Sequence, residues 1–284
     1  MLIAILAGAG GASLAFLLVF LLMCPRAARA GAGGGRPAAW AARLGDARTA
    51  SVATLGPVGA FVLFLGAGVF LTTGAAIALG EALSRLEGPV DWPTFHWIAR
   101  VQDHDAAHLV ETIGKMGNIS QTRGVGLVAA IGLIFLARDR RWVPPLLIGS
   151  VILVQKYAQT GIAKIVDRGH PPTTLGTYPS GGCARTIVIY GSIVFLVLAY
   201  TAASRRRRAA GWALIAMLAF AEGYTRTYLN KHWVTDVLGG WAFGFMLLVV
   251  VVFAGRALLA PGAQVTGRTQ PPASSRRSTV VTAS

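Results

Sequence analysis

Charged side chains are scarce in this sequence. Only 13% of its 284 residues are Asp, Glu, Lys or Arg, whereas 54% are hydrophobic, and the mean hydropathy is +0.60. A soluble domain carries about twice that share of charge, roughly 25%. The shortage of charge argues against an ordinary soluble domain and favours a membrane protein.

Cysteine and acidic residues are also few. Cys24 and Cys183 are the two cysteines, and the topology derived below places them on opposite faces of a membrane, where they cannot form a bridge. The 11 acidic residues stand against 26 basic ones, which gives a net charge of +15. Because the arginines are divided among short loops, we interpret this charge as membrane topology, and we expect no nucleic-acid partner.

What the chain has in abundance is long uncharged segments. A helix needs roughly 20 apolar residues to cross the hydrocarbon, and polar residues are tolerated at its ends. Seven segments meet this need and predict an all-α bundle of membrane helices: Met1–Pro25, Thr49–Gly80, Gly124–Ala137, Trp142–Gln155, Thr186–Ser204, Ala209–Ala221 and Val237–Gly255.

The basic residues predict the orientation of this bundle. One set of connections holds 16 of the 26 Lys and Arg residues and two acids, for a net charge of +14, and the remaining connections sum to +1. The positive-inside rule makes the basic set cytoplasmic, with the N-terminus outside and the C-terminus inside. That set consists of residues 24–54, 138–141 and 204–208 and the tail from Arg256.

The first apolar segment has a second interpretation. Residues 1–23 resemble a signal peptide, because Ala28-Arg29-Ala30 resembles a cleavage site. However, no basic residue precedes the segment and Arg26 and Arg29 follow it, so we favour an uncleaved helix. The predicted division is an N-terminal membrane helix, a basic cytoplasmic connector, a six-helix membrane domain and a disordered cytoplasmic tail, over residues 1–25, 26–54, 55–256 and 257–284.

Polar residues gather in the predicted outer loops, at about residues 157–185 and 223–235. One group is "YPSGGCAR", residues 178–185, and another is "TRTYLNKHWVTDVLGG", residues 225–240. Charge beside hydrocarbon is costly, so such groups mark function by default. The alternative is that they are interfacial anchors, which we accept for Lys156 and Lys231.

The residue types in these groups suit a phosphate. Arg offers a planar fork that matches phosphate oxygens. Ser180, Gly181 and Gly182 directly precede a predicted helix, whose N-terminus favours an anion. His232 and Asp236 are four residues apart, so on a helix they share a face, and the carboxylate can orient the imidazole.

These residues carry a family resemblance. Arg226-x5-His232-x3-Asp236 resembles the third signature of the type-2 phosphatidic acid phosphatase superfamily, Pro179-Ser180-Gly181 its second, and "KIVDRGHPP" at 164–172 its first, Lys-x6-Arg-Pro. The resemblance extends over roughly residues 57–255. It implies a six-helix core to which the first helix is an addition, and a metal-independent reaction that needs no cofactor.

The same resemblance implies roles for individual residues. His232 is the nucleophile that forms a phosphohistidine, and Asp236 orients it. The residues that hold the phosphate are Lys164, Arg168, His170, Ser180, Gly181, Gly182 and Arg226.

Two signatures depart from the family pattern. The second normally ends in His, the general acid that protonates the leaving oxygen, and this chain has Gly182 there. In the first, His170 replaces the Arg before Pro, and Lys164 is one residue too close to it. Loss of a general acid costs about 10²–10⁴-fold, and a diphosphate needs that proton least because its leaving group is already a stable anion. His170 is a candidate substitute acid.

The expected protein is a multi-pass plasma-membrane phosphatase whose active site faces outside. Its expected partners are membrane lipids and a lipid phosphate or isoprenoid diphosphate substrate. The alternatives are a catalytically impaired family member that serves as a binding or scaffold protein, a phosphoryl transferase, and a transporter. The last is disfavoured because the charges lie at helix ends on one face and not at mid-membrane.

Overall fold

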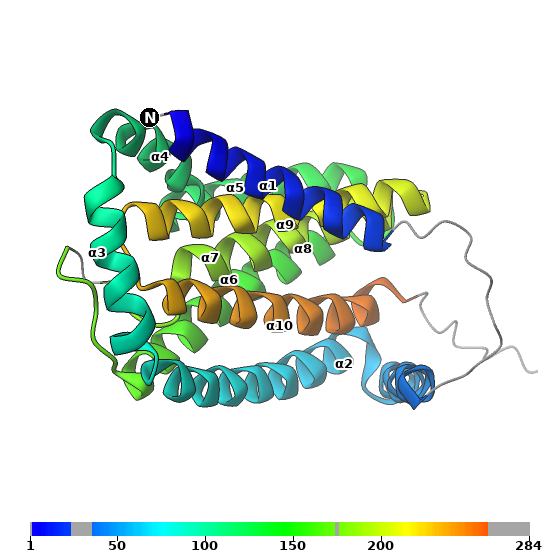
Figure 1. Cartoon of the computed structure of the whole chain (residues 1–284). Coiled ribbons are helices and arrows are strands. Elements are labelled where there is room, and N and C mark those ends of the chain that lie inside the picture. The colour runs from blue at the N-terminus through cyan, green and yellow to red at the C-terminus, as the bar shows by residue number, and fades with distance from the viewer. Residues whose placement is uncertain (1, 24–35, 174–175, 261–284) are drawn as a thin grey trace, which may run out of the picture.

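The computed structural model describes residues 2–23, 36–173 and 176–260, and over this part of the chain the regular structure is entirely helical (Figure 1). The segments α7, η3 and α8 form one continuous helix, Gly181–Tyr200. The elements in order are α1 (Leu2–Met23), α2 (Arg36–Ser84), η1 (Glu87–Asp91), α3 (Trp92–Val101), α4 (His104–Gly114), η2 (Lys115–Gly117), α5 (Ile119–Leu136), α6 (Val143–Val166), α7 (Gly181–Arg185), η3 (Thr186–Tyr190), α8 (Gly191–Tyr200), α9 (Arg205–Tyr228) and α10 (Val234–Leu259).

The long helices lie side by side and alternate in direction. Two pairs join helices that are far apart in the sequence: α1 packs along α9, and α2 packs along α10. The consecutive helices α5 and α6 also pack together. The helix α3 crosses the ends of the bundle, with α4 beside it (Figure 1). We call this side the α3 end. The connections α5–α6 and α8–α9 lie at the opposite end.

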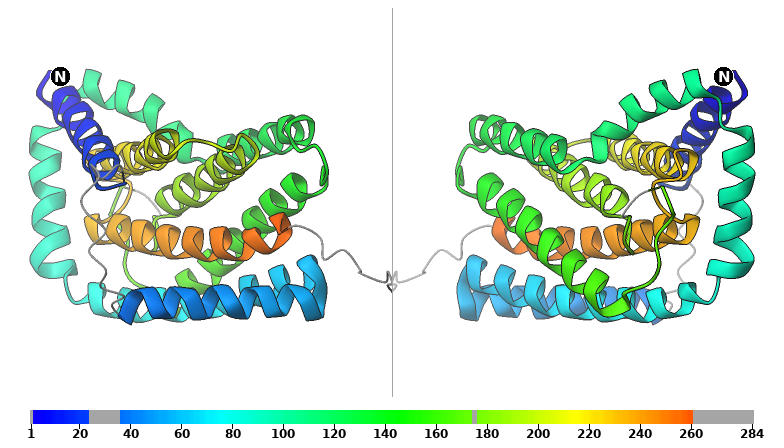
Figure 2. Two further views of the ribbon diagram at one scale, coloured as in Figure 1. Left: turned by 90° about the vertical axis from the view of Figure 1, so that its right-hand side faces the viewer. Right: turned by 90° about the vertical axis from the view of Figure 1, so that its left-hand side faces the viewer.

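The helix α2 is bent at Gly56 and Pro57. Gly56 has φ 73° and ψ 172°, a conformation that suits glycine, and Pro57 lacks the N–H that would continue the preceding helix. In Figure 1 the residues before the bend are seen nearly end-on, whereas in Figure 2 they lie across the view. The two parts of α2 therefore run in different directions.

Each of the seven apolar segments predicted from the sequence is helical over most of its described residues. Among the described residues, five helices are long and apolar enough to span a membrane: Ala42–Ser84, Ile119–Leu136, Val143–Val166, Gly181–Tyr200 and Val234–Leu259. The apolar part of α1, Leu6–Phe20, is shorter, and α9 begins with four arginines. Large apolar side chains such as Phe70, Val128 and Phe135 are exposed on the outside of the bundle, as lipid-facing residues are. The predicted all-α membrane bundle is confirmed.

The predicted connector at residues 26–54 differs from expectation in one part. We expected residues 27–45 to form a loose segment, but α2 already begins at Arg36, because Ala-rich sequence with few breakers favours a helix up to Gly56. Cys24 and the tail from residue 261 lie outside the described residues.

Candidate functional site

His232 lies at the α3 end, in the connection between α9 and α10. The sequence predicted that His232 and Asp236 share a helical face, and that prediction is wrong. The helix α10 begins at Val234, so His232 precedes it, and the residue that caps the helix is Trp233. The backbone N–H of Trp233 donates to Asp236 Oδ2 over 3.2 Å, which fixes the start of the helix.

The cap brings the Asp236 carboxylate close to the imidazole in spite of this difference. Asp236 Oδ2 is 3.6 Å from His232 Nδ1, beyond a good hydrogen bond but within ion-pair range. Asp236 is fully buried, and the His232 side chain is 14% exposed. The pair therefore joins a buried carboxylate to an imidazole that a ligand can reach from the surface.

Arg168 is the nearest cation to this pair. Its Nε lies 3.7 Å from Asp236 Oδ1, and its Nη2 donates to Asp91 Oδ2 over 2.6 Å. Asp91 also accepts bonds from the backbone N–H and the hydroxyl of Thr235, at 3.0 and 2.6 Å. Asp91 thus binds Arg168 to the first turn of α10.

The Ser180 turn meets the same helix start. The Ser180 N–H donates to the Asp236 carbonyl over 3.0 Å, and the helix α7 begins at the next residue, Gly181. A side chain at Gly181 would collide with the amide of Gln159, so the turn packs tightly on α6. Ser180 therefore lies directly beside Asp236, although 56 residues separate them in sequence.

Arg226 is held by its own helix and by the α4–α5 connection. Its Nε donates to Glu222 Oε1 over 2.6 Å, and these two residues form an ion pair one turn apart on α9. Its Nη2 donates to the Gly114 carbonyl and to Asn118 Oδ1, at 2.7 and 3.0 Å. These bonds occupy the Nε and Nη2 donors of Arg226.

Glu222 fills the space in front of Gly182. A Cβ at Gly182 would lie 2.9 Å from Arg226 Nε and closer still to Glu222 Oε1. Glu222 is completely buried, and it also fills the space in front of Gly117. The position at which the family resemblance predicts a histidine side chain is therefore occupied by the Glu222–Arg226 ion pair.

Two residues expected to bind phosphate lie apart from this cluster. Lys164, in the last turn of α6, is exposed and lines a separate cavity with Arg185. His170 is exposed, and its Nδ1 lies 3.0 Å from the Pro171 carbonyl oxygen. The structure joins neither residue to His232.

Buried polar atoms without a hydrogen-bond partner gather around His232. In the described part of the chain six of these eight atoms belong to five residues of this cluster, and the other two are on Thr186 and Tyr200. Three of these atoms lie in ion pairs just beyond hydrogen-bond distance: Arg168 Nε is 3.7 Å from Asp236 Oδ1, and His232 Nδ1 is 3.6 Å from Asp236 Oδ2. Arg168 Nη1 has no such pair among the described residues, and a buried polar atom without a partner is rare and calls for an explanation, such as a ligand. The six atoms are Arg168 Nε and Nη1, Ser180 Oγ, Glu222 Oε2, His232 Nδ1 and Asp236 Oδ1.

The charges of this cluster are nearly balanced. Arg168 and Arg226 form ion pairs with Asp91, Asp236 and Glu222, and Arg185 lies within electrostatic range of Glu222. Three cations therefore meet three carboxylates, and these groups together carry little net charge.

Sequence reasoning missed Asp91 as a site residue. Asp91 lies more than 70 residues from its partner Arg168, and its local sequence resembles an ordinary helix start. One signal was present: a carboxylate between Val90 and Trp92, beside an apolar stretch, is costly unless it is paired.

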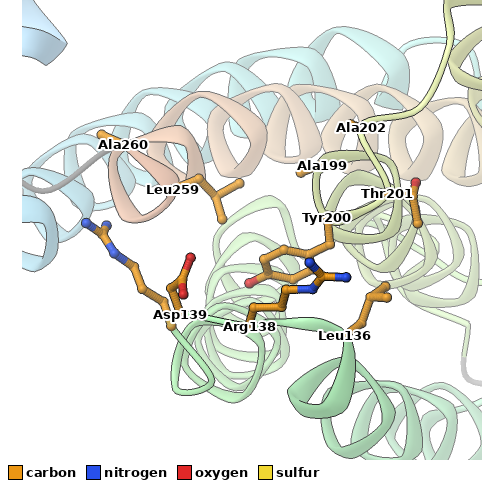
Figure 3. Close-up of a pocket in the computed structure, with 10 residues that line it drawn as sticks. Leu136, Arg138, Asp139, Ala199, Tyr200, Thr201, Ala202, Leu259 and Ala260 are labelled. Atoms are coloured by element: carbon orange, nitrogen blue, oxygen red, sulfur yellow. The ribbon is translucent and has the colours of Figure 1, made fainter.

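A cavity of about 660 Å³ lies at the end opposite His232 (Figure 3). It is lined by residues of the α5–α6 and α8–α9 connections, among them Arg138, Asp139 and Tyr200. Its place in the fold separates it from the cluster around His232.

Three comparisons with known proteins find relatives of one family. Residues 167–257 match the PAP2 superfamily. The chain is 23% identical over 198 residues to phosphatidylglycerophosphatase B of Bacillus subtilis (strain 168), which covers 69% of this chain and 92% of that protein. It also resembles the crystal structure of a transmembrane PAP2 type phosphatidylglycerolphosphate phosphatase from Bacillus subtilis, with a TM-score of 0.50 and 20% identity over 69% of this chain and 93% of that one. The resemblance predicted from the polar groups is confirmed: residues 167–257 match the PAP2 superfamily, and the described residues form a helical membrane bundle similar to a solved PAP2 type phosphatase.

Proposed function

We propose that this protein is a membrane lipid phosphatase that works through a phosphohistidine on His232, at the outer membrane face. The observation that carries the proposal is the imidazole of His232, which is partly exposed and lies 3.6 Å from the buried Asp236. Arg168 flanks Asp236, with Nε 3.7 Å from its carboxylate and Nη1 without a hydrogen-bond partner among the described residues. A nucleophile, an orienting carboxylate and a guanidinium with free donors are the groups that phosphoryl transfer needs.

The reaction has two steps. In the first, Nε2 of His232 attacks phosphorus, so that a P–N bond forms while the bond to the leaving oxygen breaks and that oxygen keeps the electron pair. In the second, a water oxygen attacks phosphorus, the P–N bond breaks, and inorganic phosphate leaves after the water loses a proton. Asp236 holds Nδ1 toward itself and stabilises the positive charge on the ring.

Arg168, the Ser180 hydroxyl and the backbone of Gly181 hold the phosphate oxygens in this proposal. Arg226 contributes through its charge, since its Nε and Nη2 are already bonded to Glu222, Gly114 and Asn118. Lys164 and His170 lie outside this set of phosphate contacts and contribute charge at longer range.

The absence of a histidine at position 182 bears on the substrate. A lipid diphosphate releases a phosphate anion that needs little protonation, whereas a phosphomonoester releases an alkoxide that needs it strongly. We infer that lipid diphosphates, such as isoprenoid diphosphates, are turned over better than phosphatidic acid. The names of the relatives add phosphatidylglycerophosphate to the substrates to be tested.

The test is release of inorganic phosphate by the purified protein in detergent micelles, from phosphatidylglycerophosphate, phosphatidic acid and an isoprenoid diphosphate. The natural protein releases phosphate, His232→Ala releases none, and a labelled substrate leaves an acid-labile phosphoenzyme on the natural protein alone. Phosphate release by folded His232→Ala at the natural rate contradicts the mechanism.

A second function has one observation in its favour. Gly182 has no side chain that could act as the general acid, and Glu222 fills the space in front of it. The chain therefore also fits a catalytically impaired binding or scaffold protein. Phosphate binding without release from any of the three substrates supports that function and rejects the phosphatase. Transfer of the labelled phosphate to an added alcohol instead of water identifies a phosphoryl transferase.

A further inference from the structure

A second polar cavity lies at the α3 end, between α5, α6 and α7. Its volume is about 480 Å³. Among the described residues that line it, Arg123, Lys156, Lys164 and Arg185 are basic and Asp167 is acidic. Its described lining therefore carries a net charge of about +3, whereas the charges around His232 nearly cancel.

The four cations form no contact ion pair with a carboxylate in the described part of the chain. Arg185 donates hydrogen bonds to neutral groups, the Gly117 carbonyl over 3.1 Å and Gln159 Oε1 over 3.5 Å, and Glu222 lies within electrostatic range of it. Four unpaired cations around one hollow repel one another, and an anion between them relieves this repulsion.

Ordinary interfacial anchoring explains only part of this arrangement. Arg123 and Lys156 are exposed, as basic residues that reach toward lipid headgroups are. Arg185 is half-buried and lies in the second turn of the membrane-length helix Gly181–Tyr200, where a guanidinium without a contact ion pair is costly and marks a function.

The cavity shares its wall with the His232 cluster. Arg185 lies in α7, the same short helix as Gly181 and Gly182. Gln159, which also lines the cavity, reaches the Pro179 carbonyl at 3.4 Å and packs on Gly181. Asp167 lines the cavity, and the next residue, Arg168, belongs to the His232 cluster.

We propose that this cavity binds a second, non-reacting phosphate group of the substrate. This inference rests on the proposed phosphatase function and narrows its substrate class to lipids that carry two phosphates. Guanidinium and ammonium groups bind phosphate oxygens through charge-assisted bonds, and basic pockets between membrane helices accept lipid phosphates in this way. The cavity supplies the positive charge that the His232 cluster lacks.

Direct binding tests the cavity without turnover. The background variant is His232→Ala in a neutral detergent, and the probe is short-chain phosphatidylglycerol, which carries a phosphodiester and no group to hydrolyse. We expect calorimetric binding that falls about tenfold or more in Arg123→Gln/Lys156→Gln, because each lost charged bond weakens binding by roughly that factor. Arg100→Gln removes an exposed arginine at the same end that does not line the cavity, and we expect it to bind the probe normally.

Two binding outcomes overturn the inference. If Arg123→Gln/Lys156→Gln and Arg100→Gln bind short-chain phosphatidylglycerol with equal affinity, the cavity cations act only through the general charge of the protein surface. Binding of inorganic phosphate with no binding of short-chain phosphatidylglycerol shows a site for free phosphate and not for a lipid. Competition between the two ligands at the cavity supports the inference.

Measuring turnover in variants that keep His232 gives a second test that is independent of the binding experiment. We expect Arg123→Gln/Lys156→Gln to raise KM for phosphatidylglycerophosphate about tenfold while kcat stays constant, and to change phosphatidic acid turnover little. An equal rise in KM for both lipids contradicts the inference. If the natural protein hydrolyses neither lipid, the phosphatase function fails, while the binding experiment still decides whether the cavity holds a lipid phosphate.

Discussion

At the scale of single residues, Gly182 and Glu222 depend on each other, because both concern the same small volume of the site. Glu222 occupies the volume in front of Gly182, and its Oε1 accepts from Arg226. A histidine at position 182 therefore has no room unless the carboxylate is removed. The second signature has Gly182 where the family has a histidine, and the buried Glu222, four residues before Arg226, fills the space of that missing side chain.

This coupling predicts a non-additive pair of variants. Gly182→His alone should lower activity and stability, because its Cβ collides with a buried carboxylate. Gly182→His/Glu222→Ala should raise phosphatidic acid turnover above that of Glu222→Ala by about 10²-fold, the usual effect of a general acid, and raise diphosphate turnover less. The measurements are kcat/KM for both lipids and the thermal midpoint in detergent.

Two results contradict this coupling. One is a gain of activity from Gly182→His alone, which shows that the carboxylate yields easily. The other is an equal rise for both lipids, which shows that the new imidazole is not acting as an acid.

At the scale of elements, Asp91 connects three parts of the chain. It ends η1, precedes α3, and accepts bonds from Arg168 and from Thr235 in the first turn of α10. A buried carboxylate in this place fixes the surface helix α3 to the helix that carries Asp236. The cluster around His232 therefore depends on an element outside the family match at residues 167–257.

Asp91→Ala should destabilise the protein by about 3–5 kcal/mol, because it leaves the buried Arg168 guanidinium without its nearest partner. Activity should fall in parallel, since Arg168 loses its fixed position. Asp105→Ala, which removes an exposed carboxylate in α4, serves as the control and should change stability by less than about 0.5 kcal/mol. Thermal unfolding in detergent measures both, and equal midpoints for the two variants contradict the role of Asp91.

At the scale of the whole molecule, the direction of the bundle remains a prediction. The α3 end carries His232 and the four-cation cavity, and the opposite end carries Arg205–Arg208. The charge division predicts that the α3 end faces outside.

Labelling of single cysteines tests this orientation. In a Cys24→Ser/Cys183→Ala background, Arg100→Cys should react with an impermeant maleimide on intact spheroplasts. Arg206→Cys should react only after the membrane is opened. The reverse pattern places the candidate site inside.

The sequence by itself determined the all-helical membrane bundle, because hydrocarbon thickness fixes the length of an apolar helix whatever it packs against. It also indicated His232, Asp236, Arg168 and Ser180, because their types and spacing suit phosphate chemistry. The tertiary structure decided what surrounds them. Asp91 beside Arg168, Glu222 in front of Gly182 and the four cations between α5, α6 and α7 are brought together by helix packing, and local sequence holds no record of contacts between residues so far apart in the chain.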